Sequence, residues 1–374
     1  MKKIAILLAA DETRMMSKTP AAQHTVCGKP MVEYVIGAVK AAGAEEIFFE
    51  EECNAEQLCT VLDAMQSGLV YLIGSAMPLV EKKDLEMLAQ DADCFAADAL
   101  GCVRAQALRG AMEGSECIAD AVEKVREHAK RAWIEKDRMT AVEDRVKLAA
   151  AEKLMRARIN EKLMLSGVTL IDPENTYIED TVVIGQDTVV YPGCTLQGNT
   201  VIGRDCVIYP HCRMSNAVVG DGTTVEASVL LDCAVGSFTT VGPNAYLRPK
   251  TIIGDHCRIG DFVEVKNSAI GNGTKVSHLT YVGDADLGEN INLGCGVVFS
   301  NYDGKKKYRS VIGDNAFIGC NVNIVSPVNV GDDAYIAAGS TITGDVPGGS
   351  LAIARERQIN KAGWVDARKA EGKL

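Results

Sequence analysis

Three side chains in this 374-residue sequence could bind an anionic molecule and remove a proton from it, and they are separated by multiples of six residues. Arg248 and Lys266 are 18 residues apart, and His278 follows Lys266 by 12 residues. Two cations held on a rigid surface suit a phosphate or a carboxylate. A histidine can take up a proton near neutral pH, because its unperturbed pKa is about 6.5. Together these residue types predict a site that binds an anionic substrate and removes a proton from it.

The elements that would position these residues are short repeats that begin after Gly167. An aliphatic residue followed by glycine recurs there, mostly at steps of 6, 12 or 18 residues with slips of one. This period is typical of a left-handed parallel β-helix of hexapeptide repeats, in which three units complete one triangular coil. The expected inward-facing aliphatics are Ile184, Ile202, Val219, Val235, Val241, Ile253, Ile259, Ile270, Val282, Leu287, Leu293, Ile312, Ile318 and Val330. Arg248 and Lys266, one coil apart, should then stack on one face.

One polar segment interrupts the repeats. Residues 300–310 read Ser-Asn-Tyr-Asp-Gly-Lys-Lys-Lys-Tyr-Arg-Ser, which is too polar for the interior of a β-helix. We therefore expect a loop that leaves the coil, either as a plain solvated loop or as part of a site. Loops on rigid scaffolds often carry function, and three lysines in this one favour the second interpretation.

The composition excludes several classes of protein. The formal charge is −11 and the pI about 5.1, which opposes general nucleic-acid binding. No apolar run approaches the roughly 20 residues of a membrane span. Thirteen cysteines are scattered without a C-x-x-C pair, as in cytosolic proteins with reduced thiols, so zinc is not expected. We expect a cytoplasmic protein without nucleic-acid or membrane partners.

The residues before Gly167 predict a different architecture. The apolar run after Lys3 fits the buried first strand of a Rossmann-like α/β domain better than a signal peptide. Leu148, Met155, Ile159 and Leu163 share one face of a helix. The expected organisation is an α/β domain at 1–143, a connecting helix at 144–166, the β-helix at 167–347 and a C-terminal tail at 348–374.

Six strings between residues 241 and 355 carry a resemblance to a known family. They are Val-Gly-Pro-Asn-Ala-Tyr-Leu-Arg-Pro, Gly-Asp-Phe-Val-Glu-Val-Lys, Ser-His-Leu-Thr-Tyr-Val-Gly-Asp-Ala, Ser-Asn-Tyr-Asp-Gly-Lys, Ile-Ala-Ala-Gly-Ser-Thr-Ile-Thr and Leu-Ala-Ile-Ala-Arg. From Arg248 to Trp364 the chain resembles the acetyltransferase half of the bifunctional bacterial N-acetylglucosamine-1-phosphate uridylyltransferase/glucosamine-1-phosphate acetyltransferase family. A weaker likeness extends to residue 1.

The resemblance implies a role for each matching residue. His278 would be the catalytic base that frees the sugar amine to attack acetyl-CoA, with Asn292 orienting the base or the acetyl group. Substrate would contact Arg248, Lys266, Tyr281, Asn301, Tyr302 and Lys307. Acetyl-CoA, the co-substrate, would contact Cys295, Cys320, Ala338 and Arg355. The family is trimeric, so a homotrimer is implied. Acetyl transfer needs no metal, and its product is a precursor of UDP-N-acetylglucosamine for the cell wall.

The first half of the chain departs from the family. The nucleotide-binding Leu-Ala-Ala-Gly-x-Gly-Thr-Arg reads Leu8-Ala-Ala-Asp-Glu-Thr-Arg14 here, with both loop glycines lost and two carboxylates, Asp11 and Glu12, in their place. Ala21 replaces a lysine, the segment 74–78 lacks the metal-binding Asp, and Glu143 replaces an Asn ligand. The domain is also shortened. We therefore expect that uridylyl transfer, with its metal, is lost.

Three alternatives to this function stay open. The acceptor could be another amino sugar or a nucleotide sugar, because two cations do not identify a sugar ring. The chain could be a non-catalytic scaffold or regulatory paralogue. A full bifunctional enzyme is a further alternative, which the changes in the first half oppose.

Overall fold

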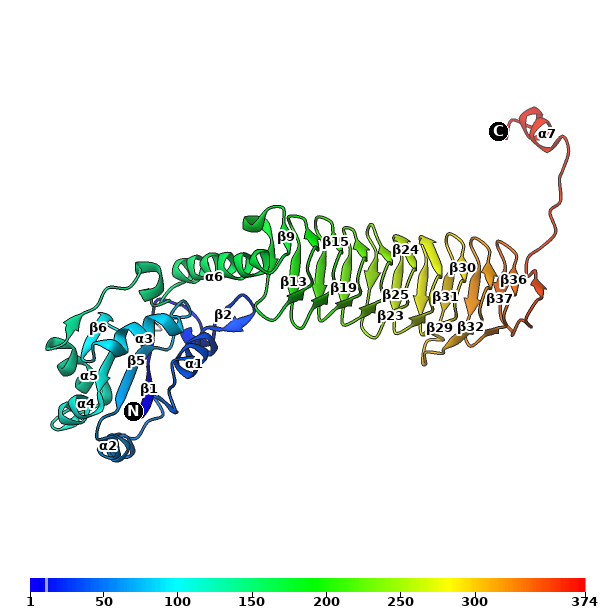
Figure 1. Cartoon of the computed structure of the whole chain (residues 1–374). Helices are drawn as coiled ribbons and strands as arrows, with labels where there is room; N and C mark the ends of the chain where they lie inside the picture. The colour runs from blue at the N-terminus through cyan, green and yellow to red at the C-terminus, as the bar shows by residue number, and fades with distance from the viewer. Residues whose placement is uncertain (11–12, 374) are drawn as a thin grey trace. The chain divides into compact units, whose positions relative to one another are not determined.

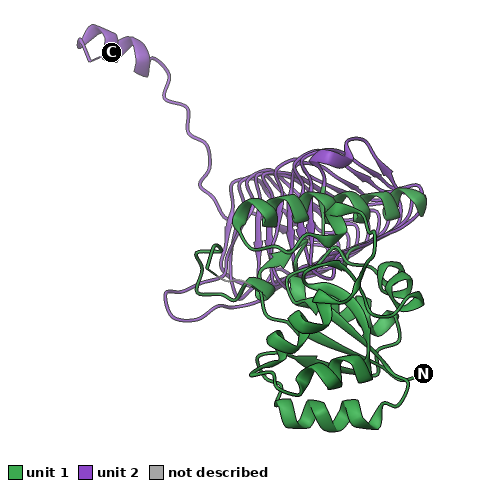
Figure 2. Cartoon of the chain, turned by 90° about the vertical axis from the view of Figure 1, so that its left-hand side faces the viewer, with its two compact units in different colours: residues 1–166, 177–182 green, residues 167–176, 183–374 purple. Residues whose placement is uncertain are grey.

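The structure, a computed structural model, describes residues 1–10 and 13–373 and divides the chain into two compact units (Figure 2). Unit 1 comprises residues 1–166 and 177–182, and unit 2 comprises residues 167–176 and those from 183 onward. No helix among the described residues is both long enough and apolar enough to span a membrane.

Unit 1 is an α/β domain around a mixed sheet with the strand order β4-β1-β5-β7-β6-β8. The central strand β1 (Lys3–Leu8) is parallel to both of its neighbours, β4 (Glu46–Phe49) and β5 (Leu69–Gly74). Alternate residues of β1 enter two hydrophobic cores, one on each face of the sheet. A strand covered on both faces reads as a continuous apolar run, which confirms the α/β prediction.

The remaining elements of unit 1 are the other strands of this sheet, β6, β7 and β8, three short strands outside it, and the helices. The strands are β2 (Thr25–Val26), β3 (Lys29–Pro30), β6 (Cys94–Ala97), β7 (Leu100–Arg104), β8 (Lys130–Arg131) and β10 (Tyr177–Ile178). The helices are α1 (Met31–Ala41), α2 (Ala55–Ala64), α3 (Lys82–Gln90), α4 (Ala105–Met112), α5 (Ile118–Glu127) and α6 (Arg145–Leu165). Short 3-10 helices lie at Ala21–Gln23 and Lys136–Met139, with a third in unit 2 at Pro173–Asn175.

Helix α6 follows the apolar stripe that the sequence shows. The Asp144 side chain caps its start by accepting a hydrogen bond from the Lys147 N–H at 2.8 Å. Met155 and Ile159 are buried on one face. The helix ends at Leu165 and packs as part of unit 1.

Unit 2 is a parallel β-solenoid with three faces, which confirms the hexapeptide prediction (Figure 1). Each strand pairs in parallel with the strand one coil later, and every aliphatic residue of the repeat is buried in the prism. The narrow interior accounts for a core with few aromatic side chains.

The three faces are numbered in the order of β13, β14 and β15, which follow one another along the chain. The first face contains β13 (Thr195–Gln197), β16 (Arg213–Ser215), β19 (Val229–Leu231), β22 (Tyr246–Leu247), β25 (Glu264–Lys266), β28 (Tyr281–Gly283), β31 (Val298–Ser300), β34 (Asn323–Val325) and β37 (Thr341–Ile342). The second face contains β11 (Val183–Ile184), β14 (Val201–Ile202), β17 (Val218–Val219), β20 (Ala234–Val235), β23 (Ile252–Ile253), β26 (Ala269–Ile270), β29 (Ala285–Leu287), β32 (Ser310–Ile312) and β35 (Asn329–Val330). The third face contains β9 (Thr169–Leu170), β12 (Val189–Val190), β15 (Val207–Ile208), β18 (Thr224–Val225), β21 (Thr240–Val241), β24 (Arg258–Asp261), β27 (Lys275–His278), β30 (Asn292–Leu293), β33 (Phe317–Ile318), β36 (Tyr335–Ile336) and β38 (Leu351–Ala352). Helix α7 (Trp364–Ala370) follows the last coil.

The polar segment after β31 leaves the coil as a loop, residues 301–309, and returns at β32. Asp303 organises the loop by accepting hydrogen bonds from the backbone N–H groups of Lys305 and Lys306 at 2.7 and 2.6 Å. Tyr308 donates its hydroxyl to the same carboxylate at 3.0 Å. The loop is therefore held in shape by its own side chains.

Candidate functional site

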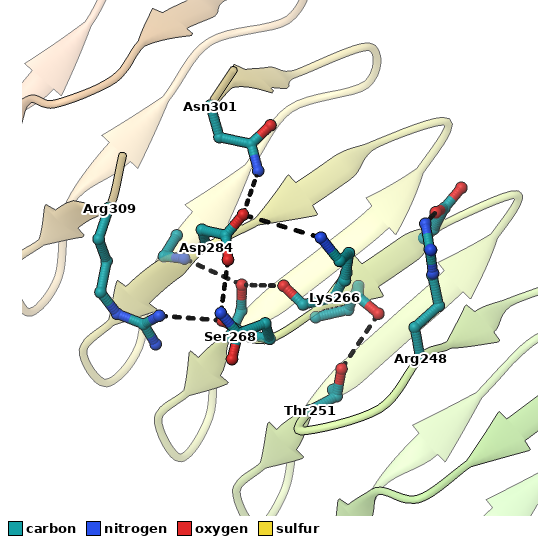
Figure 3. A network of polar contacts seen from close by, with 11 residues as sticks. Arg248, Thr251, Lys266, Ser268, Asp284, Asn301 and Arg309 are labelled. Atoms are coloured by element: carbon teal, nitrogen blue, oxygen red, sulfur yellow. Dashed lines mark hydrogen bonds and ion pairs between the residues drawn. The ribbon is translucent and has the colours of Figure 1, made fainter. Parts of the chain in front are cut away.

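Arg248 and Lys266 occupy the same position on neighbouring coils of the first face. Leu247 pairs with Val265, and the Arg248 N–H donates to the Val265 carbonyl at 2.9 Å, so the residues that follow lie side by side. The 18-residue spacing predicts this stacking. The Arg248 guanidinium is held by the Glu264 carboxylate, with 2.7 Å between Nη1 and Oε1. Both cations project from the same edge of the face (Figure 3).

The loop adds a third cation to this surface. Contact with Lys307 lowers the pKa of Lys266 below its usual value; partial burial and the charge of Arg248 lower it further, and Asp284 raises it. Clustered like charges are unfavourable until an anion neutralises them. The next coil places Tyr281 opposite Glu264, which is beside the same cations. We call Arg248, Lys266, Tyr281, Asn301 and Lys307 the cation site.

His278 lies at the end of the third face, in contact with a carboxylate that sequence reasoning missed. Asp261 is its register partner one coil earlier, and 2.5 Å separates Asp261 Oδ1 from His278 Nδ1. Strands β24 and β27 are each four residues long, which extends the pairing to these two residues. Gly260 permits it, because a Cβ there would lie 1.9 Å from the Ser277 carbonyl oxygen.

The geometry of this pair orients the imidazole. With Nδ1 directed at Asp261, the other ring nitrogen, Nε2, is the one that can accept a proton from a substrate. The hydrogen bond to His278 holds the pKa of the Asp261 carboxyl below its usual value. The carboxylate therefore remains charged near neutral pH and can stabilise an imidazolium. The side chain of His278 is half exposed, so a substrate can reach it.

Asp261 and His278 begin a row of residues that has one member on each successive coil, which we call the column. The residues expected to contact acetyl-CoA continue this column. The carbonyl of each column member accepts a hydrogen bond from the backbone of the next coil, at 3.4 Å for His278 and 2.8 Å for both cysteines. In consequence the column runs through His278, Cys295, Cys320 and Ala338. Arg355 follows at its end, with Cδ 3.6 Å from the position of a Cβ on Gly339.

Two further expected residues lie outside that column. Asn292, in β30, pairs with Lys275 and Phe317, three positions before the column on the third face. Tyr302 is exposed in the loop and donates its hydroxyl to the Gly304 carbonyl at 2.7 Å. One coil of unit 2 joins the column to the cation site, because only the turn at Leu279 and Thr280 separates His278 from Tyr281.

In unit 1, the positions that correspond to the family's metal ligands are occupied differently. Glu143 contacts Lys147 at 2.6 Å and Arg14 at 3.8 Å, and Arg14 also pairs with Asp144 at 3.1 Å. The Glu143 carboxylate is thus in contact with two cations. No group of three or more His, Cys, Asp or Glu side chains that could hold a metal occurs among residues 1–10 and 13–373.

A cavity of about 250 Å³ lies at the carboxyl ends of β1, β4 and β5, where α/β domains bind ligands. Its lining includes Glu50, Glu51 and Glu52, and Glu50 accepts a hydrogen bond from the Ala9 N–H at 2.8 Å. A backbone N–H that could bind a phosphate is therefore already paired with a carboxylate. The expectation for Asp11 and Glu12 concerns residues outside the described ones.

Repeats of this type, stacked into a parallel solenoid, are those of the hexapeptide acyltransferase class of enzymes. The family model "Bacterial transferase hexapeptide (six repeats)" matches residues 181–216, 232–267 and 309–344. The chain belongs to the family of the bifunctional GlmU proteins. The "Bifunctional protein GlmU" of Clostridium botulinum (strain 657 / Type Ba4) is 39% identical over 452 positions, which cover 98% of this chain and 99% of the relative.

Two further relatives support the same family assignment. The "Bifunctional protein GlmU" of Clostridioides difficile (strain 630) is 38% identical over 449 positions, covering 98% of both chains. That of Clostridium botulinum (strain ATCC 19397 / Type A) is 57% identical over 232 residues, which are 62% of this chain and 51% of the relative. The longer alignments exceed the 374 residues of this chain, so these relatives have residues with no counterpart here.

Proposed function

We propose that the chain transfers the acetyl group of acetyl-CoA to the amine of glucosamine 1-phosphate and so forms N-acetylglucosamine 1-phosphate. One observation carries the proposal: within unit 2, a carboxylate-supported histidine and a cluster of three cations occupy one end of neighbouring coils. A phosphate group satisfies the cations, and a nucleophile that must lose a proton matches the histidine.

The chemistry follows from the two sites. Arg248, Lys266 and Lys307 bind the phosphate, while Tyr281, Asn301 and Tyr302 complete the acceptor site. His278 Nε2 takes a proton from the attacking amine as its nitrogen bonds to the thioester carbonyl carbon. The tetrahedral intermediate then collapses, the C–S bond breaks, and the imidazolium returns its proton to the leaving thiolate. Asp261 keeps the ring oriented throughout.

Acetyl-CoA lies along the column in this proposal. Cys295, Cys320 and Ala338 continue directly from His278, so a thioester placed on them would reach the base, and Arg355 would meet the cofactor's phosphates. Asn292, on the flat third face, would orient the acetyl group from a position that a neighbouring prism can cover. We therefore propose a homotrimer in which adjacent prisms share each site.

The direct test is release of the CoA thiol from acetyl-CoA with a panel of acceptors: glucosamine 1-phosphate, glucosamine 6-phosphate, glucosamine and UDP-glucosamine. We expect glucosamine 1-phosphate to give the highest kcat/KM. A higher value for another panel member would assign a different acceptor. No turnover, together with no binding of acetyl-CoA in calorimetry, would indicate a non-catalytic protein.

We expect Arg248→Ala and Lys266→Ala each to raise the KM for glucosamine 1-phosphate by about tenfold or more. Each removes a charge-assisted hydrogen bond to the phosphate, worth about 1.5–3 kcal/mol. The KM for acetyl-CoA should stay constant, which steady-state kinetics with each substrate varied will show. The matched control is Arg213→Ala, a cation on the first face two coils before Arg248. Equal changes in both KM values would contradict the assignment.

We expect Asp261→Ala to lower kcat by about tenfold or more with little change in either KM. The variant keeps the proton acceptor but loses the group that orients it and stabilises its charged form. Single-turnover measurements at saturating substrate report this step. Glu226→Ala, which removes an exposed carboxylate on the third face two coils earlier, serves as control. An unchanged kcat in the Asp261 variant would exclude the orienting role.

A further inference from the structure

One carboxylate of unit 2, that of Asp284, contacts both the coil residue Lys266 and the loop residue Asn301 of the cation site. Asp284 follows β28 directly and is only 7% exposed. Its Oδ2 accepts a hydrogen bond from Asn301 Nδ2 at 2.5 Å and lies 4.0 Å from Lys266 Nζ. Its Oδ1 accepts from Asn267 Nδ2, also at 2.5 Å. Figure 3 shows Asp284 between Lys266, on the coil, and Asn301, where the loop begins.

Asp284 also contacts the other end of the loop. Its backbone carbonyl accepts a hydrogen bond from the Ser310 N–H at 3.2 Å, where the chain re-enters the coil. Its own N–H donates to the Lys266 carbonyl at 3.0 Å. The residue therefore fixes both ends of the segment that carries Lys307, and it does so at the position where Lys266 projects.

The same turn occurs three coils earlier without any site attached. Asp232 follows β19 as Asp284 follows β28, and both have a positive φ, 44° and 51°. Asn216 Nδ2 donates to Asp232 Oδ1 at 3.1 Å, as Asn267 donates to Asp284 Oδ1. Asp232 is exposed, however. Building the turn thus needs one carboxylate oxygen, and the second oxygen of Asp284 is directed at Lys266 and Asn301.

We propose that Asp284 is the positioning residue of the acceptor site: it fixes the lysine that binds the phosphate and the asparagine and loop that enclose it. This inference rests on the proposed function. Asp284 Oδ2 faces both Lys266 and Asn301. Its backbone supplies one group to each side of the site, the N–H to the Lys266 carbonyl and the carbonyl to the Ser310 N–H.

The charges around Lys266 give this role a measurable signature. Lys307, Arg248 and Asp284 are the groups that shift the pKa of Lys266, and of these Asp284 raises it while the two cations lower it. Lys266 binds a phosphate in its protonated form. Removing the charge of Asp284 should lower the pKa of Lys266 further, so its proton is lost at a lower pH.

The test compares Asp284→Asn, Asp284→Glu and wild type. For Asp284→Asn we expect the KM for glucosamine 1-phosphate to rise about tenfold or more. The KM for acetyl-CoA should not change, and the alkaline limb of kcat/KM against pH should move to lower pH. Asp284→Glu displaces the carboxylate but keeps its charge, so it should raise the same KM without moving the limb. Asp232→Asn, the matched control for the turn, should alter neither quantity.

Several results would overturn the proposal. They are an unchanged KM in the folded variants, equal rises in both KM values, or an alkaline limb that Asp284→Asn leaves in place. If Asp284→Asn does not fold, the KM of Asp284→Glu decides. Binding of inorganic phosphate, measured by calorimetry, separates this inference from the proposed function. Weaker binding in Asp284→Asn than in Asp232→Asn supports Asp284 even when wild type acetylates no amino sugar, and equal binding opposes it.

Discussion

His278→Ala is expected to slow acetyl transfer by about 10²- to 10⁴-fold, the usual contribution of a general base. The amine nitrogen becomes positively charged as it bonds to the thioester carbon, and an amide forms only when a base takes the proton from that nitrogen. Nε2 of His278 is placed for this, because Nδ1 is held by Asp261 at 2.5 Å. The KM for glucosamine 1-phosphate should change little, since the proposed phosphate contacts are those of the cation site and not of His278. Thiol release from acetyl-CoA measures the loss directly.

The control for this variant is His256→Ala, which removes an exposed histidine on the coil of Asp261. That ring stacks on Phe238, with 5.3 Å between the centroids, and it belongs neither to the cation site nor to the column. It should leave kcat unchanged. Calorimetry should show that the His278 variant still binds acetyl-CoA, because the rest of the column is intact. Undiminished turnover in His278→Ala would remove the histidine from the mechanism.

The repeat period predicts the cation site better than it predicts the base. Eighteen residues make one full coil, so the stacking of Arg248 and Lys266 could be read directly from the sequence. Twelve residues make two of the three faces, and slips of one residue left the face of His278 open. In the structure it ends the third face, and the turn after it brings Tyr281 to the first face. The histidine therefore meets the cation site across a corner of the prism.

Asp261 and Asp284, the two carboxylates beside the candidate site, could not be identified from the repeat period. Asp261 precedes His278 by 17 residues, one short of a full coil, so pairing them required the register of two extended strands. Asp284 resembles Asp232 in its local sequence position, but it is buried, and Asn301 and Ser310 at the two ends of the loop contact it. Whether a carboxylate serves a turn or a site depends on contacts between distant residues, which spacing alone does not specify.

In the first half of the chain too, the sequence alone does not show which side chains are paired. Its sequence reveals that glycines and an Asp of the family's pattern are missing. It does not reveal that Glu143, which stands where an Asn ligand is expected, is paired with Lys147 and Arg14. Nor does it show that Glu50 accepts the N–H of Ala9 beside the cavity. The sequence shows which residues of the family's pattern are missing, and these contacts show what the residues in their place bind instead.

We expect no UDP-N-acetylglucosamine to form from UTP and N-acetylglucosamine 1-phosphate in the presence of Mg²⁺. A triphosphate would enter a cavity lined by Glu50, Glu51 and Glu52, where like charges repel it. The position of the family's metal-binding Asp lies in the segment 74–78, Gly-Ser-Ala-Met-Pro, which supplies no carboxylate to a metal that would offset this charge. Chromatography of the reaction mixture, or pyrophosphate release, measures the product.

The same preparation must acetylate glucosamine 1-phosphate, so that the absence of uridylyl transfer is a property of unit 1 and not of damaged protein. Titrating Mg²⁺ over a wide range tests whether weak metal binding limits the reaction. Metal-dependent formation of UDP-N-acetylglucosamine would show that this shortened domain keeps the second activity. Since Glu143 contacts two cations, any such activity should respond to Glu143→Asn, which frees Lys147, leaves Arg14 paired with Asp144 and restores the family's ligand type. An inactive enzyme that stays inactive in this variant places the defect in the missing carboxylate and the acidic cavity, which one substitution does not repair.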